Sequence, residues 1–141
     1  MLEYLFIYGS LITGSGNRTI DRCIQNDCQQ LGEATIKGKL FDLGDYPGAV
    51  PNHYRHNIRG QLLKLIKPAK TLALLDHYEA YYPDNLKQSE FIRKKTEVKL
   101  NENGKTLLCW VYWYNRKVSR GRVITTGDYE QYLRDKTKLT N

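Results

Sequence analysis

The chain of 141 residues is 40% hydrophobic and 26% charged, which is typical of one folded domain and excludes a disordered chain. Lys and Arg number 22 against 15 Asp and Glu, so the formal net charge of +7 favours anionic partners in general. Cys23, Cys28 and Cys109 are too few and too irregularly spaced for a disulfide framework or zinc knuckle, and they predict a reduced, cytoplasmic setting. We expect one domain over residues 1–141 and no membrane partner, because the apolar N-terminus lacks a basic leader and is too short to span a bilayer.

The first third of the chain predicts strands, a short helix and loops. Residues 4–11, YLFIYGSL, predict a buried strand that stops at a glycine and enters a tight loop. Residues 12–19 are loop-like, and Asn17 or Thr19 can cap a helix predicted over 20–31, where one side carries Ile20, Ile24, Cys28 and Leu31. A strand is predicted over 34–44, and the proline and glycine of DYPGAVPN predict a loop over 45–52.

The rest of the chain again mixes strands and helices. Residues 58–66 predict a strand, and Pro68 suits the first turn of a helix over 69–81 that stops before Pro83. Asn103-Gly104 joins predicted strands over 90–100 and 106–115 as a hairpin, and a turn and helix follow over 125–136. This order does not alternate regularly enough for a doubly wound sheet, so we expect an α+β fold with a small mixed sheet or barrel and flanking helices.

Glu79 is the first candidate for chemistry. Leu72, Leu75, Tyr78, Glu79 and Tyr82 fall at helical spacing, so the Glu79 carboxylate borders the apolar face of its helix. Burial disfavours an ionised carboxylate and can move its pKa toward the range useful for proton transfer near neutral pH. The alternative is a structural glutamate at the border of the helix that pairs with one of the many basic residues.

A second candidate is the YGSL segment, residues 8–11. A strand ends there at a glycine, and successive amides in such a turn can converge on an anion or a carbonyl oxygen. An ordinary strand-to-loop turn is the alternative. Ser10 is a poor candidate nucleophile, because no G-x-S-x-G elbow surrounds it and no histidine is placed to pair with it.

Other polar or reactive clusters have structural explanations. The basic runs IRKK (92–95) and NRKVSRGR (115–122) match no nucleic-acid motif, so we interpret them as a solvated strand end and a loop. His53 and His56 are expected on the surface rather than in a metal site. Cys23 and Cys28 are expected to pack rather than react.

Seven segments occur in order along the chain: YLFIYGSL (4–11), LFDLGDYPGAV (40–50), RGQLLKL (59–65), LLDHYEAY (74–81), FIRKKTEV (91–98), CWVYWY (109–114) and TGDY (126–129). The series resembles the γ-glutamylcyclotransferase-like family, which includes γ-glutamylamine cyclotransferases and related bacterial proteins. The resemblance extends to about Tyr129. It implies a small β-barrel with flanking helices and a cavity between the Tyr-Gly-Ser-Leu loop and the glutamate that ends a Leu-Asp-x-x-Glu helix.

Carried over by position, this resemblance implies roles for particular residues. Glu79 becomes the catalytic general acid and base, and the substrate-binding loop is Tyr8, Gly9, Ser10 and Leu11. Recurrent positions that line or support the cavity fall on Tyr46, Arg93 and Tyr112. Two residues depart from the family pattern: Ala80 stands where glycine is frequent, and Tyr129 stands where tryptophan is frequent.

The implied reaction is intramolecular. The α-amine of a γ-glutamyl amide attacks its own γ-carbonyl, 5-oxoproline (pyroglutamate) forms, and an amine leaves. This chemistry needs no metal, nucleotide or covalent nucleophile, so we expect no cofactor and a small-molecule γ-glutamyl partner. The alternative is a ligand-binding module that keeps the cavity without turnover. Nucleic-acid binding through the basic runs is a third hypothesis, which we disfavour.

Overall fold

The strands of the protein form a barrel. The computed structural model describes residues 2–51, 55–119 and 122–139. The barrel order is β1 (Tyr4–Ile7), β5 (Asn57–Leu65), β2 (Cys28–Lys37), β6 (Phe91–Leu100) and β7 (Thr106–Tyr114). Neighbouring strands run antiparallel except β1 and β7, which close the barrel in parallel at Leu5 and Trp110. The expected α+β fold, a small mixed β-barrel with flanking helices, is confirmed.

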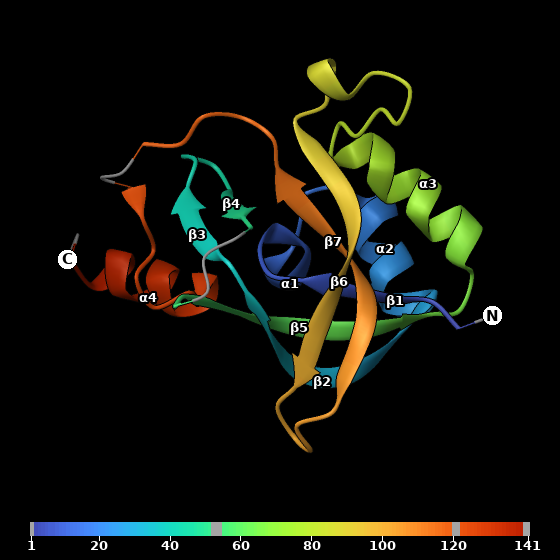
Figure 1. The fold of residues 1–141 in the computed structure, drawn as a ribbon, viewed down its shortest axis with the longest axis horizontal. Helices are drawn as coiled ribbons and strands as arrows, with labels where there is room; N and C mark the ends of the chain where they lie inside the picture. The colour runs from blue at the N-terminus through green and yellow to red at the C-terminus, as the bar shows by residue number, and fades with distance from the viewer. Residues whose placement is uncertain (1, 52–54, 120–121, 140–141) are drawn as a thin grey trace.

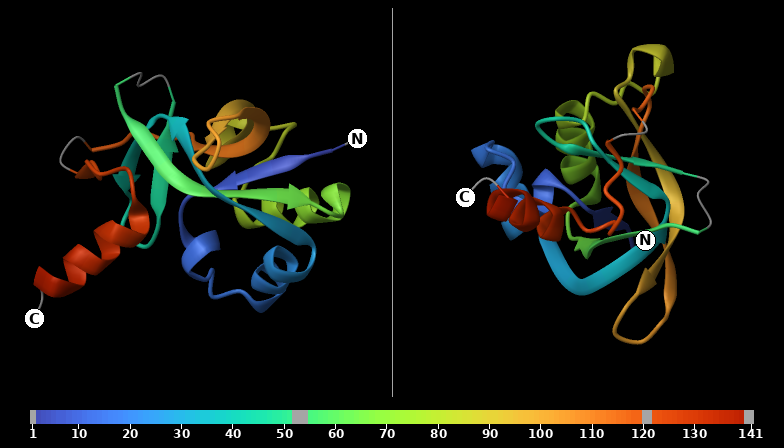
Figure 2. Two further views of the ribbon diagram at one scale, coloured as in Figure 1. Left: turned by 90° about the horizontal axis from the view of Figure 1, so that it is seen from below. Right: turned by 90° about the vertical axis from the view of Figure 1, so that its left-hand side faces the viewer.

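Helices and a second small sheet flank this barrel. The helices are α1 (Ser10–Thr13), α2 (Arg18–Asn26), α3 (Pro68–Tyr78) and α4 (Tyr129–Leu139), with a 3₁₀ turn η1 (Leu86–Gln88). The second sheet pairs β3 (Lys39–Asp42) with β4 (Pro47–Val50). Helices α2 and α3 pack together on one side of the barrel, whereas β3, β4 and α4 lie on the other (Figures 1 and 2).

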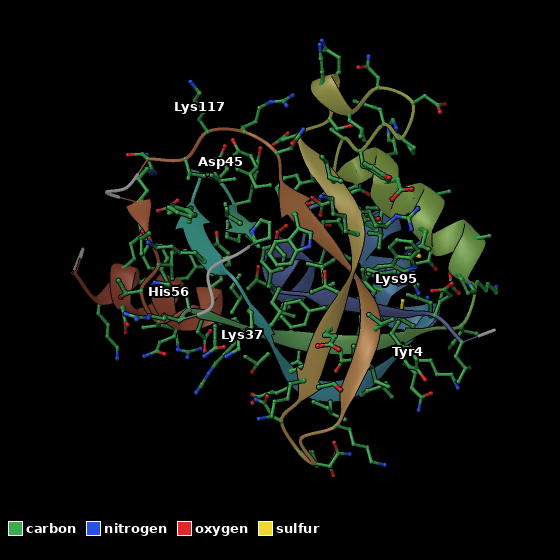
Figure 3. The ribbon with its side chains drawn as sticks, viewed as in Figure 1. Tyr4, Lys37, Asp45, His56, Lys95 and Lys117 are labelled. Carbon is green, nitrogen blue, oxygen red and sulfur yellow. The ribbon has the colours of Figure 1, made fainter. Side chains whose placement is uncertain are left out.

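Side chains fill both faces of the barrel wall (Figure 3). Along β1, Phe6 points into the core that includes Ile36, Leu62, Val98 and Val111. Leu5 and Ile7 point into a second core, which they share with residues of α2 and α3. Successive side chains of a strand face opposite sides, so β1 is apolar throughout because both of its faces are covered.

The predicted helix over 20–31 is wrong in its second half. Helix α2 ends at Asn26 and β2 begins at Cys28, so Cys28 and Leu31 belong to a strand. The N-terminal prediction is confirmed, since the Asn17 side chain accepts hydrogen bonds from the amides of Thr19 (3.0 Å) and Ile20 (3.2 Å). Of the four apolar residues near helical spacing, Ile20 and Ile24 lie in α2, whereas Cys28 and Leu31 lie in the strand that follows it.

Three further boundaries differ from expectation. The predicted strand over 34–44 is two strands, β2 and β3, separated at Gly38. Residues 47–50 form β4 rather than a loop; proline is tolerated there because it is the first residue of a strand paired on one side only. Residues 10–13, which span the predicted strand end and loop, form the single turn α1. The Asn103-Gly104 hairpin is confirmed, with φ of +72° at Gly104.

Candidate active site

A cavity of about 240 Å³ opens where the ends of several elements meet. The end of β1 and the start of α1 form one wall, the end of α3 another, and the starts of β4 and β6 a third. Its described lining is Phe6, Ile7, Tyr8, Gly9, Ser10, Leu11, Tyr46, Pro47, Tyr78, Glu79, Glu90, Phe91 and Tyr112. Segments far apart in the chain are therefore brought together by closure of the barrel.

Gly9 lets the loop after β1 approach β4 closely. A Cβ atom at this position would lie 2.7 Å from Pro47 Cγ, so a larger residue would push the loop and β4 apart. The next residue, Ser10, ties this loop to α3, because its hydroxyl lies 3.1 Å from the Tyr78 hydroxyl. The amides of Ser10 and Leu11 begin α1 and have no carbonyl one turn earlier in that helix to bind. Ser10 and Leu11 line the same cavity as Glu79.

Glu79 is the residue on which α3 ends. The Glu79 amide still donates to Leu75 O (2.8 Å), and the chain then reverses: Ala80 N–H bonds His77 O (3.2 Å) and Tyr81 N–H bonds Asp76 O (2.8 Å). These last two bonds define a Schellman motif, whose first residue past the cap adopts the left-handed conformation. Ala80 occupies that position with φ of +53°, where glycine is the usual choice. This reversal of the chain ends α3 and fixes the position of Glu79 as the residue that caps it.

Ala80→Gly is expected to stabilise the protein. The left-handed conformation costs a residue with a Cβ about 1–2 kcal/mol, and the greater freedom of glycine in the unfolded chain offsets about 0.5–1 kcal/mol of that. We therefore expect the free energy of unfolding to rise by about 0.5–1 kcal/mol, measured by urea denaturation. Ala73→Gly, inside α3, is the matched control and should destabilise by about 1 kcal/mol. Destabilisation by both substitutions would contradict the strain at Ala80.

The environment of Glu79 raises the pKa of its carboxyl to about 8, through burial first and then the negative charge of Glu90. The residue keeps some exposed surface because it lines the cavity, but protein surrounds the carboxyl and removes much of its hydration. A carboxyl that titrates near neutral pH can both accept and return a proton. The structural alternative of a border glutamate paired with a basic residue finds no support, since no described cation forms an ion pair with Glu79.

Tyr8 and Tyr112 contribute shape rather than titratable hydroxyls. The buried Tyr8 hydroxyl donates to Tyr112 O (2.6 Å) and accepts from the Ala49 amide (3.3 Å). The Tyr112 hydroxyl donates to Asp76 Oδ1 (2.7 Å). Burial is the main cause that raises the pKa of both tyrosines, so both hydroxyls stay protonated at neutral pH. Their rings form a fixed wall of the cavity.

Among the residues named from the sequence, Arg93 lies outside the cavity lining. Its guanidinium donates to both oxygens of Asp76 (2.8 and 3.0 Å) and lies 4.1 Å from the ring centroid of Trp110. Because Asp76 also binds the Tyr112 hydroxyl, Arg93 stands one layer behind the wall and supports it. The other seven, Tyr8, Gly9, Ser10, Leu11, Tyr46, Glu79 and Tyr112, all line the cavity.

Sequence reasoning missed Glu90 as a cavity residue, whereas Tyr78, one of the tyrosines beside Glu79 expected in the cavity wall, lines the cavity. Glu90 directly precedes β6, and it reaches the site because its amide donates to Ala80 O (3.0 Å). Tyr46 donates its hydroxyl hydrogen bond to Glu90 Oε1. Neither contact leaves a local sequence pattern, since residues 46, 80 and 90 are distant along the chain. Tyr78 was available from the helical spacing, directly beside Glu79.

The basic runs have partners within the protein. Lys95 pairs with Glu3 (2.6 Å), and Arg116 donates to the carbonyl oxygens of Lys87, Gln88 and Ser89. Lys117 points outward from the segment after β7 (Figure 3). Much of this charge therefore stabilises a strand and a loop, in line with our interpretation of the two runs.

Other predictions concerned metals, membranes and thiols. In the described parts of the chain, no three His, Cys, Asp or Glu side chains gather as a metal site would need. His53 lies outside the described residues. None of the described helices is long and apolar enough to cross a membrane. The three cysteines are free and buried, and burial raises the pKa of Cys28 and of Cys109 to about 12, which makes both thiols unreactive.

Residues 5–131 match the family described as "Gamma-glutamyl cyclotransferase, AIG2-like". The chain belongs to this family. A curated relative from Niallia circulans, γ-L-glutamyl-butirosin B γ-glutamyl cyclotransferase, is 31% identical over 113 residues, which are 79% of this chain and 67% of the relative. Membership supports an enzyme of γ-glutamylcyclotransferase type, without naming its substrate.

Solved structures share the fold of this γ-glutamylcyclotransferase-family chain. The crystal structure of YkqA from Bacillus subtilis superposes with a TM-score of 0.70 at 20% identity, over 98% of this chain and 43% of YkqA. The chain thus spans less than half the length of that protein. A mouse AIG2-like protein superposes with a TM-score of 0.68 at 18% identity, over 91% of this chain and 88% of its own. At these identities the likeness concerns the fold alone.

Proposed function

We propose that the protein cyclises a γ-glutamyl amide to 5-oxoproline with release of an amine, and that Glu79 is the general acid and base. The observation that carries this proposal is that Glu79 lines the same cavity as the first residues of α1, and that its carboxyl has a pKa raised to about 8. A single group that must take a proton and then return it works best when its pKa lies near the operating pH.

Glu79 relays the protons of the proposed reaction. It takes a proton from the α-ammonium group of the substrate, and the resulting amine attacks the γ-carbonyl carbon to close a five-membered ring. Glu79 then gives that proton to the scissile nitrogen as its bond to the γ-carbon breaks. The ring nitrogen finally loses its extra proton, which Glu79 passes to the released amine, so the products are 5-oxoproline and an ammonium ion and Glu79 returns to the carboxylate. Both reacting groups belong to one molecule, and holding them in a bent geometry contributes about 7–11 kcal/mol to lowering the barrier.

The substrate also carries two groups that need backbone donors. These are the α-carboxylate and the oxyanion that develops when the γ-carbonyl is attacked. The amides of Ser10 and Leu11 supply such donors, and the described lining contains no lysine or arginine that would compete for the same groups. Tyr8 and Tyr112 form the wall against which the bent glutamyl group packs.

A product assay tests this proposal. The purified protein is incubated with a panel of γ-glutamyl amides and dipeptides, and 5-oxoproline is detected by mass spectrometry. We expect release from at least one compound. Thermal shift with the same panel separates the alternative, because stabilisation without product would identify a ligand-binding module. Ala80 stands where the family frequently has glycine, but this difference does not favour the ligand-binding module, since Ala80 keeps the backbone conformation that glycine would adopt there.

The pH dependence of turnover is a further prediction. Glu79 acts first as a base, and its pKa near 8 leaves less of the carboxylate as the pH falls below 8. We therefore expect kcat/KM to rise about tenfold per pH unit up to pH 8 and then to level off. Glu90→Gln removes the second cause of the raised pKa and should move the rising limb to lower pH. If kcat/KM stopped rising below pH 5, that result would contradict the raised pKa of Glu79.

A further inference from the structure

The cavity contains a second acid that the proposed reaction does not use. Glu79 and Glu90 are the only ionisable residues other than tyrosine in the described lining, and no lysine, arginine or histidine accompanies them there. No described cation forms an ion pair with Glu90. Its side chain accepts a hydrogen bond from Tyr46 and otherwise faces the cavity without a counter-charge.

Glu90 is held firmly in this position. Its amide donates to Ala80 O (3.0 Å), and its carbonyl accepts from the Asn115 amide (2.8 Å), so its backbone is fixed between the end of α3 and the end of β7. The Tyr46 ring, which carries the hydroxyl bound to Glu90, packs on Phe91 with 6.1 Å between ring centroids. A carboxylate fixed in this way is preorganised to bind a group of opposite charge.

Both acids line the same cavity. The loop of residues 8–11 and Glu79 are the part proposed to hold the glutamyl group. Glu90 lies with Tyr46, Pro47 and Phe91 at the starts of β4 and β6, which form another part of the lining. A volume of about 240 Å³ is small beside the range of about 300–1,000 Å³ for pockets that bury drug-sized ligands. A leaving amine that extends from Glu79 would pass other lining residues, and among these Glu90 is the charged one.

We infer that Glu90 is a specificity-determining residue that selects γ-glutamyl conjugates whose leaving amine carries a second positive charge. This inference rests on the proposed function. An ammonium group a few bonds from the scissile nitrogen would pair with Glu90 and Tyr46, whereas a carboxylate at the same place would be repelled. The second charged group takes no part in the reaction: the ring C–N bond forms, the γ-carbon–nitrogen bond breaks, and the leaving nitrogen gains the proton carried by Glu79 and the proton lost by the ring nitrogen.

A matched set of substrates tests the inference. Three γ-glutamyl conjugates differ only at the far end of the amine: 1,4-diaminobutane ends in a cation, n-pentylamine in a methyl group, and 5-aminopentanoate in an anion. A parallel set with two fewer methylenes covers shorter reach. We expect kcat/KM to fall in that order, by about tenfold or more at each step, as for a charged hydrogen bond gained or lost. In Glu90→Gln the three values should come within about threefold of one another.

Ratios of kcat/KM within one variant cancel any general change in rate that Glu90→Gln causes through Glu79. Glu102→Gln, in the exposed turn between β6 and β7, removes the same charge outside the described cavity lining and should keep the wild-type order. A binding measurement separates selectivity from turnover. Calorimetry with Glu79→Gln, and with Glu79→Gln combined with Glu90→Gln, compares the dissociation constants of the same three conjugates.

The outcomes distinguish the inference from the proposed function. Turnover with no charge order, or with an order that Glu90→Gln leaves intact, would overturn the role of Glu90 while the cyclisation stands. Charge-ordered binding without any turnover would overturn the cyclisation and support selection by Glu90. If none of the conjugates is bound or turned over, the role of Glu90 is wrong; the cyclisation is wrong as well if the panel of γ-glutamyl amides and dipeptides also yields no 5-oxoproline.

Discussion

Glu79→Gln is expected to lower the rate of 5-oxoproline release by about 10²–10⁴-fold, the usual contribution of a general acid or base. Glutamine keeps the size and hydrogen-bonding shape of the protonated carboxyl but cannot accept the proton of the α-ammonium group. Initial rates of product formation at saturating substrate measure the loss. Equal turnover by Glu79→Gln and wild type would remove Glu79 from the mechanism. Glu102→Gln controls for the change in net charge.

The same variant has an expected signature in stability. In the folded protein the pKa of Glu79 is raised to about 8, against an ordinary value of 4.5. Between these values the folded state holds a proton that the unfolded chain has lost, so the free energy of unfolding falls as the pH rises from 4.5 to 8. Glutamine cannot ionise and avoids this loss. The stability advantage of Glu79→Gln over the wild type should therefore be larger at pH 8 than at pH 5, by on the order of 3 kcal/mol. Urea denaturation of both proteins at the two pH values measures it.

Asp76→Ala is expected to cause the largest loss of stability among the substitutions considered. The Asp76 carboxylate accepts two hydrogen bonds from Arg93 and one from the Tyr112 hydroxyl, and both partners of the ion pair are about five-sixths buried, at 15% and 18% side-chain exposure. Its removal leaves the Arg93 charge uncompensated and the Tyr112 hydroxyl without its acceptor. We expect the free energy of unfolding to fall by about 2–4 kcal/mol, measured by urea denaturation.

Two companion variants separate the causes of that loss. Asp76→Asn keeps an acceptor for Tyr112 and should lose less stability than Asp76→Ala. Arg93→Met in the Asp76→Ala background removes the uncompensated charge and should recover part of the loss. Because Tyr112 lines the cavity, Asp76→Ala should also raise KM more than it lowers kcat. Wild-type stability in Asp76→Ala would show that the Arg93 pair contributes nothing.

The part of the site that local patterns specify could be predicted from the sequence. Helical spacing placed Glu79 at the border of an apolar face, and Pro68 marked the start of its helix. The Asn103-Gly104 turn fixed the β6–β7 hairpin in the same way. In each case a few neighbouring residues determine the backbone, so their pattern is enough. The predicted end of the helix at residue 81, before Pro83, was wrong, because the helix ends at Tyr78 and the chain reverses at Ala80.

The rest depends on contacts between distant segments. Cys28 and Leu31 continue a helical spacing from α2, but β2 pairs with β5 there, and that pairing decides the structure. Residues 47–50 become a strand because β3 lies beside them. Glu90 reaches the cavity through a bond to Ala80, ten residues earlier. The spacing of apolar residues along the sequence does not indicate such contacts between distant segments.

The connection between α3 and β6 is closed at its base. Ser89 is fully buried; its hydroxyl accepts from the Tyr82 amide (2.8 Å) and lies within hydrogen-bonding distance of the carbonyl oxygens of Tyr82 and Asn85. With the Glu90–Ala80 bond, this clamp fixes the spacing of the two cavity acids, and from the exposed residues 83–88 it uses a backbone carbonyl, that of Asn85, rather than a side chain. That tip can therefore exchange its side chains while the acids stay in place. It is a natural position for evolution to add recognition elements, or for an engineer to graft a peptide.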